Sequence, residues 1–210
     1  MLVIPAFLEE DSNQIIKKLG EFSEEVSWIQ IDFADETMTD SRTCDLHELI
    51  GELGSFNVEV HLMTKDPVQY FDVCDMLGAK RVYFHIGEVE SPSAVLVAMD
   101  PYDFTKGIVL SPQTQVEDAF TYIDEVDAVQ IMTVVPGAQG GEYLPEMLSK
   151  ATYLRERRGD LWISVDGGVN EKTIGDIKIK SVDAVGVGSA LMNTDDVMNQ
   201  YRRLQKLAAV

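Results

Sequence analysis

Polar side chains recur at every second position in three otherwise apolar segments of the chain. They are Gln30 and Asp32 in "WIQIDFAD" (28–35), Glu59 and His61 in "VEVHLM" (58–63), and Ser164 and Asp166 in "LWISVD" (161–166). A β-strand repeats every two residues, so within each segment the polar side chains share one face and Ile, Val or Leu share the other. We therefore ask what lies on the polar face.

Two carboxylates and an imidazole suit two kinds of chemistry. Together they can bind a divalent metal ion, and a carboxylate pair can remove and return a proton. A single inward His or Asp is more often a structural residue. Three of them at the ends of strands are better explained by a site, because burying charges is costly unless they are paired or bind a metal. Asp32, His61 and Asp166 are the candidates.

Short apolar runs alternate with amphipathic ones along the whole chain, and this alternation decides where the candidates lie. The predicted strands are residues 2–7, 28–33, 58–63, 81–86, 107–111, 128–134, 161–166 and 184–188. Helix-start signals fall between them, at Asp11-Ser12, Asp66-Pro67, Thr114, Asn170 and Asp195. The segment 91–99 is open to a helical or an extended conformation.

Strict alternation of strand and helix predicts right-handed βαβ units and a parallel sheet. Eight units in 210 residues predict a compact α/β fold, a single (β/α)8 TIM barrel domain over residues 1–210. A doubly wound open sheet is the alternative, but its glycine-rich loop would follow the first strand, where this chain has "PAFLEED" (5–11). In a barrel, Ile, Val and Leu face the helices, and the polar residues point inward at the C-terminal mouth.

Three glycine-rich loops follow the last three predicted strands. They are "VPGAQGG" (135–141), "DGGVN" (166–170) and "GVGSA" (186–190). Glycine lets backbone N–H groups approach a ligand closely, and phosphate recurs at this place in such barrels. We expect a phosphate pocket here, formed by Gly137, Ala138, Gly140, Gly141, Gly167, Gly168, Gly188 and Ser189.

Charge and composition argue against some classes of binding partner and some cellular locations. A formal net charge of −19 argues against nucleic acid or an anionic membrane as a partner. No apolar run approaches the roughly 20 residues that cross a bilayer, and "MLVIPAFL" does not resemble a signal peptide. Cys44 and Cys74 have no metal-ligand spacing and are expected to be reduced thiols. We expect a cytoplasmic protein.

Six segments resemble the ribulose-phosphate 3-epimerases and their close relatives on the ribulose-phosphate-binding barrel. In chain order they are "WIQIDFAD", "VEVHLMTKDP", "VYFHIGE", "VQIMTVVPGAQGGEYLPEML", "ISVDGGVN" and "VGVGSALM". The likeness covers nearly the whole chain. It implies that Asp32 and Asp166 exchange a proton at C3 of a ketose phosphate, from opposite sides of the sugar, through an enediolate, interconverting ribulose 5-phosphate and xylulose 5-phosphate.

The resemblance also implies a cofactor and further site residues. A divalent ion (Zn, Mn, Fe or Mg) would be held by Asp32, His61 and Asp166, with Gln30 where the family has a second metal-binding His. Met63 and Met132 would form an apolar floor of the pocket, near the reacting carbons, although plain core filling explains both equally well. The resemblance further implies a homo-oligomer, in the first place a dimer, in the pentose phosphate pathway.

Departures from the family pattern leave the activity open. Gln30 replaces a metal-binding His and weakens the metal site, and Ala6 replaces a serine of the first strand. Ala34 replaces a pocket methionine, Glu36 replaces a glycine, and the phosphate loop reads "PGAQGG" rather than "PGFGGQ". The alternative to an epimerase is a non-catalytic sugar-phosphate-binding relative that lost part of the metal site. A third hypothesis is an isomerase, aldolase or synthase that uses a similar enediolate.

Overall fold

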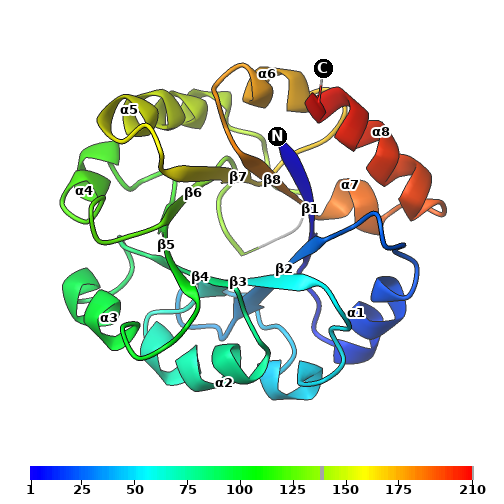
Figure 1. Cartoon of the computed structure of the whole chain (residues 1–210), viewed down its shortest axis with the longest axis horizontal. Coiled ribbons are helices and arrows are strands. Elements are labelled where there is room, and N and C mark those ends of the chain that lie inside the picture. Colours follow the sequence, from blue (N-terminus) through cyan, green and yellow to red (C-terminus); the bar gives the residue numbers. More distant parts are fainter. Residues whose placement is uncertain (138–139, 210) are drawn as a thin grey trace.

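The strands of the chain close into a parallel barrel, which confirms the predicted (β/α)8 architecture (Figure 1). A computed structural model describes residues 1–137 and 140–209. Within these residues the barrel has eight strands, each paired with its neighbours in chain order. They are β1 (Leu2–Phe7), β2 (Trp28–Ala34), β3 (Asn57–Met63), β4 (Arg81–His85), β5 (Thr105–Leu110), β6 (Ala128–Met132), β7 (Trp162–Asp166) and β8 (Ala184–Val187).

Helices form a ring outside the barrel (Figure 1). They are α1 (Ser12–Leu19), α2 (Phe71–Met76), α3 (Pro92–Ala98), α4 (Val116–Phe120), α5 (Ser149–Arg157), α6 (Ile174–Lys178), α7 (Ser189–Met192) and α8 (Val197–Ala209). Short 3₁₀-helices cover Leu46–Leu49, Pro67–Tyr70 and Pro145–Leu148. The connection from β2 to β3 has only the first of these, because Gly51 and Gly54 with positive φ follow it and end the helical path.

Capping residues mark the starts of α1, α3 and α4. Asp11 caps α1 as predicted, and its carboxylate accepts the Asn13 backbone N–H at 2.9 Å. Ser91 caps α3, so the open segment 91–99 is helical. The start signal at Thr114 falls one residue early: Gln115 caps α4, in a reciprocal capping box with Asp118.

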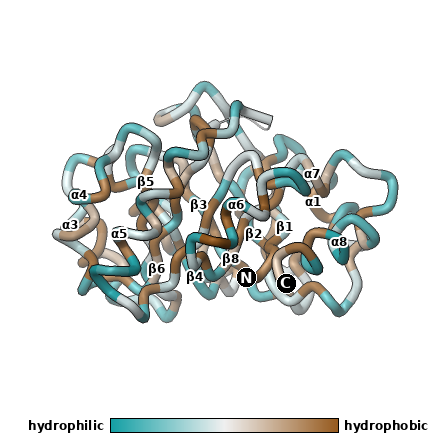
Figure 2. The backbone as a smooth tube through the Cα atoms, turned by 90° about the horizontal axis from the view of Figure 1, so that it is seen from above, coloured by the Kyte–Doolittle hydropathy of each residue, from teal (hydrophilic) through white to brown (hydrophobic). Residues whose placement is uncertain are grey.

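The two faces of each strand meet different surroundings. Outward side chains such as Ile29, Ile31 and Val60 join the main core beneath the helices. A smaller apolar cluster, which includes Tyr83, Val109 and Met132, lies apart from it. Figure 2 shows both chain termini at one end of the barrel and loops standing out at the other. No described helix is long and apolar enough to cross a membrane.

Strand register brings the candidate residues to one level. Asp32 pairs with His61 across β2 and β3, and Met132 pairs with Asp166 across β6 and β7. Because each lies at or near the C-terminal end of its strand, their inward side chains meet at the mouth of the barrel. The register thus assembles residues that are up to 134 positions apart in sequence (166 − 32).

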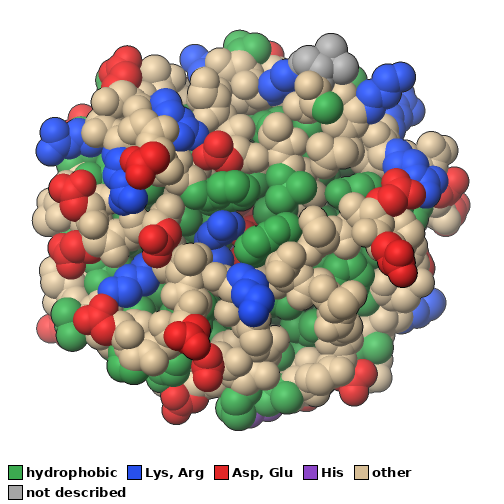
Figure 3. Space-filling model, in the orientation of Figure 1, with side chains coloured by type: hydrophobic (Ala, Val, Ile, Leu, Met, Phe, Trp, Pro, Cys, Tyr) green, Lys and Arg blue, Asp and Glu red, His purple; other side chains and the backbone are tan. Residues whose placement is uncertain are grey.

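The opposite end of the barrel is closed by an ion pair under aromatic rings. Arg81 Nη1 lies 2.8 Å from Glu59 Oε2, and both side chains are buried. The guanidinium carbon is 5.1 Å from the ring centroid of Trp28 and 4.5 Å from that of Trp162. Figure 3 views this end, where hydrophobic side chains gather around basic ones near the centre. We call Glu59, Arg81, Trp28 and Trp162 the barrel floor.

The floor predicts a pH-dependent stability. Burial raises the pKa of Glu59 from 4.5 to about 7, despite the opposing charge of Arg81. The folded chain therefore binds this proton more tightly than the unfolded chain. The stabilisation is complete below pH 4.5 and is lost as the pH rises to about 7.

Glu59→Gln should remove that dependence. Urea unfolding between pH 5 and pH 8 is expected to show the wild-type advantage over the variant falling with pH, by on the order of 3 kcal/mol. The variant also loses the ion pair, so the comparison uses the slope with pH rather than the absolute stability. Parallel curves for the two proteins would contradict the assignment.

A second prediction concerns Gly107, which pairs with Tyr83 across β4 and β5. A Cβ at position 107 would lie 2.2 Å from Tyr83 Cδ1. Gly107→Ala should therefore destabilise the fold by about 1–3 kcal/mol, as overpacking does. Gly159→Ala is the control, because a Cβ there meets nothing within 4 Å. Equal urea midpoints for the two variants would show that the Tyr83 ring can move aside.

Candidate active site

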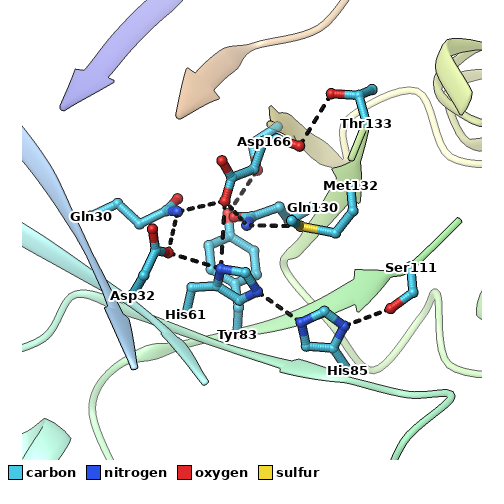
Figure 4. A network of polar contacts seen from close by, with 11 residues as sticks. Gln30, Asp32, His61, Tyr83, His85, Ser111, Gln130, Met132, Thr133 and Asp166 are labelled. Carbon is cyan, nitrogen blue, oxygen red and sulfur yellow. Dashed lines mark hydrogen bonds and ion pairs between the residues drawn. The ribbon is translucent and has the colours of Figure 1, made fainter. Parts of the chain in front are cut away.

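Asp32, His61 and Asp166 converge at the mouth of the barrel (Figure 4). His61 Nδ1 lies 2.9 Å from Asp32 Oδ1 and 3.5 Å from Asp166 Oδ2. One potential ligand atom from each residue lies within 4.8 Å of the others. The His61 side chain is 1% exposed, and those of Asp32 and Asp166 are 11% and 12% exposed. The carboxylates therefore border a surface that a ligand can reach, and the imidazole lies behind it.

Gln30 joins the two carboxylates from below. Its Nε2 donates to Asp32 Oδ1 at 2.7 Å and to Asp166 Oδ2 at 2.8 Å (Figure 4). The amide nitrogen, rather than the oxygen, faces the acidic pair. The two N–H groups of the Gln30 amide therefore partly offset the repulsion between the two carboxylates, as a cation would.

Asp166 is further held by residues on β6 and directly after it. Gln130 Nε2 donates to Asp166 Oδ2 at 3.0 Å, and the Thr133 hydroxyl donates to the backbone carbonyls of Asp166 and Gly167. The other oxygens, Oδ2 of Asp32 and Oδ1 of Asp166, have no hydrogen-bonding partner among the described residues. Each carboxylate thus keeps one oxygen for a ligand.

Electrostatics sets the protonation of this group. Burial and the charge of Asp166 raise the pKa of Asp32. Burial acts to lower the pKa of His61, but the hydrogen bonds and charges of Asp166 and Asp32 outweigh it and raise that pKa to about 9. The pair of carboxylates therefore holds a proton on the imidazole at neutral pH when no other cation is present.

The same residues fit a divalent metal ion. Two carboxylates carry two negative charges, and neutral His61 would add a nitrogen ligand at Nδ1, which faces them. The divalent ion would balance the carboxylates in place of the imidazole proton. The predicted ligand role of Gln30 requires its amide to turn over so that Oε1 faces the ion, and it stays a prediction.

A cavity opens above these residues, and most of the predicted site residues line it. Its walls include Asp32, His61, Asp166 and the methionines Met63 and Met132. The predicted phosphate residues also line it: Gly137, Gly140, Gly141, Gly167, Gly168, Gly188 and Ser189. Gln30 lies beneath the cavity, and Ala138 lies outside the described residues. Among the described residues that line the cavity there is no Lys or Arg.

Three polar residues of the site did not stand out in the sequence: His85, Ser111 and Thr133. His85 shares the inward parity of Tyr83, so the alternation that selected Asp32 could have found it. Ser111 and Thr133 directly follow β5 and β6, and only the register places them.

Comparisons with known proteins find relatives of this sequence. The sequence model described as "Ribulose-phosphate 3 epimerase family" matches residues 2–192. Among curated proteins, the ribulose-phosphate 3-epimerase of Schizosaccharomyces pombe is 26% identical, covering 91% of this chain and 86% of the relative. The protein of the same name from Synechocystis is 27% identical, covering 100% and 98%.

Solved structures repeat the fold at lower identity. The 3-hexulose-6-phosphate synthase from Salmonella typhimurium superposes with a TM-score of 0.76 at 15% identity, covering 99% of this chain and 98% of that one. At this identity the likeness concerns the barrel alone.

Gln30→His tests whether position 30 can contribute to a metal site. Imidazole is a better ligand for Zn²⁺ than an amide oxygen, so we expect Zn²⁺ affinity to rise by about tenfold or more. Titration calorimetry on metal-free protein measures it. Gln113→His, at an exposed position, controls for adventitious binding to any new histidine. Unchanged affinity in Gln30→His would place residue 30 out of reach of the ion.

Proposed function

Because the chain belongs to the ribulose-phosphate 3-epimerase family, we propose that it epimerises C3 of a ketose phosphate, interconverting ribulose 5-phosphate and xylulose 5-phosphate. The observation that carries this proposal is the pair Asp32 and Asp166. The two carboxylates come from β2 and β7, which are three positions apart around the closed barrel, yet they share hydrogen-bond donors at the mouth.

Epimerisation needs an acid and a base on opposite faces of one carbon. One carboxylate removes the C3 proton, and the other, protonated, returns a proton to the opposite face of the planar enediolate. Asp32 and Asp166 are suited to alternate in these roles, since each keeps a side-chain oxygen free. The raised pKa of Asp32 favours its acting as the proton donor.

The enediolate carries negative charge, which the site must stabilise. A divalent ion held by Asp32, His61 and Asp166 would supply the opposing positive charge. Gln30 and Gln130 contribute N–H groups that keep the acidic pair in place. Met63 and Met132 line the same cavity and offer it apolar surface.

The phosphate of the substrate would sit at the glycine loops. Backbone N–H groups near Gly167, Gly168 and Gly188 are the available donors, because the described cavity residues include no basic side chain. Gly167 and Gly168 have positive φ, and a Cβ on Gly167 would meet Val134 at 2.4 Å. Gly167→Ala would therefore distort this loop.

Solvent exchange at C3 tests the proposal. Purified protein with a defined metal is given ribulose 5-phosphate in ²H₂O, and proton NMR follows loss of the C3 signal and appearance of xylulose 5-phosphate. Deuterium at C3 in both epimers is the expected result. Binding of the sugar phosphate without exchange, under Zn²⁺, Mn²⁺, Fe²⁺ and Mg²⁺ alike, would contradict the epimerase and support a non-catalytic binder.

Removing one base should separate exchange from epimerisation. Asp32→Asn and Asp166→Asn should each lower interconversion by about 10²–10⁴-fold. Any residual exchange should favour one epimer in the first variant and the other epimer in the second, since each epimer yields its proton to a different base. Asp124→Asn, at an exposed position, is the control. Near wild-type interconversion by either site variant would refute the two-base assignment.

A further inference from the structure

A second imidazole lies directly behind His61. His61 Nε2 and His85 Nε2 are 2.8 Å apart, and the two rings stack with centroids separated by 5.0 Å (Figure 4). On its far side, His85 Nδ1 lies 2.8 Å from Ser111 Oγ. His85 is fully buried and Ser111 is 2% exposed. The contacts form a row from Ser111 through His85 to His61 and the carboxylates.

The short distance between two ring nitrogens constrains the protons. One of the two must carry the hydrogen and the other must accept it, because two lone pairs or two N–H groups at 2.8 Å would repel. A neutral imidazole holds its single proton on one nitrogen only. Which ring donates at this contact therefore determines whether Nδ1 of each neutral ring carries a proton or a lone pair.

The acidic pair favours one choice. His61 Nδ1 faces Asp32 and Asp166, where it either donates a proton to them or offers its lone pair to a cation. A lone pair at Nδ1 places the ring proton on Nε2, and a doubly protonated ring has a proton there as well. In both cases His61 Nε2–H donates and His85 Nε2 accepts; a neutral ring protonated at Nδ1 would reverse this contact, but it leaves no lone pair for a cation and so is not the metal-binding form. Neutral His85 then carries its proton on Nδ1, which donates to Ser111.

We propose that His85 is a positioning residue that fixes the Nε2–H form and the ring plane of His61, with Ser111 holding His85 in the matching form. The consequence of this arrangement is that His61 Nδ1 stays available to the metal ion, and only this consequence rests on the proposed function. Outer hydrogen bonds of this kind orient ligand imidazoles in metal sites.

Ser111 is itself held in place. Lys150 of α5 reaches into the loop after β5, and its Nζ donates to the carbonyl oxygens of Ser111 and Thr114, each at 2.8 Å. Its ammonium is thus used within the loop and lies apart from the row.

The wild-type protein gives the first test. Long-range ¹⁵N–¹H correlation spectra of histidine side chains distinguish the two neutral ring forms. The chain has three histidines, and His47→Gln identifies the exposed one. We expect His85 to carry its proton on Nδ1. A proton on Nε2 of His85 would overturn the proposal whether or not the protein has epimerase activity.

Two variants of His85 give the second test. Gln can present an acceptor oxygen near the position of Nε2, whereas Phe fills the space without one. Co²⁺ affinity, read from its visible absorption, should fall by about 10–100-fold in His85→Phe and change much less in His85→Gln. Circular dichroism checks that both fold. Equal Co²⁺ affinities in folded wild type and His85→Phe would contradict the positioning role.

The experiments distinguish failure of the proposed function from failure of the positioning role of His85. A wild-type chain that binds Co²⁺ yet shows no C3 exchange would contradict the epimerase and leave His85 supported by its effect on the metal. A wild-type chain that binds no Co²⁺ would contradict the metal site, and the ring form of His85 in the spectra would still decide its role. Ser111→Ala should release His85 from a single ring form in either case.

Discussion

Repulsion between two carboxylates is the constraint around which the mouth of the barrel is arranged. Asp32 Oδ1 and Asp166 Oδ2 both lie within reach of Gln30 Nε2 and His61 Nδ1, so the same donors serve both charges. Buried carboxylates at this separation need positive charge or N–H groups between them. The strand register, the inward amide and the imidazole all satisfy that need.

The two ends of the barrel solve the burial of charge in different ways. At the floor, Glu59 is paired with Arg81, a cation fixed to the chain and stacked between aromatic rings. At the mouth no arginine or lysine among the described cavity residues meets the acidic pair, and the balancing charge is a proton on His61 or a bound ion. A cation that can be exchanged suits chemistry, whereas a fixed one suits structure.

Alternation along the strands was sufficient to predict the barrel and to select Asp32, His61 and Asp166, because a barrel gives every inward position the same direction. It could not give the contacts between strands that are not neighbours, such as the one from Gln30 to Asp166, because these depend on register and barrel shape. The orientation of the Gln30 amide was also out of reach, since it follows from the donors and acceptors around it. His85 was hidden within an apolar run, although its parity matched.

Both tryptophans of the chain belong to the barrel floor, at the first residues of β2 and β7. Asp32 and Asp166 follow them four positions later in the same strands, about 13 Å away along the strand direction. Intrinsic fluorescence therefore reports on one end of the molecule. It follows the loosening of the floor during unfolding, and a ligand entering the opposite end leaves both indole rings in their stacked environment.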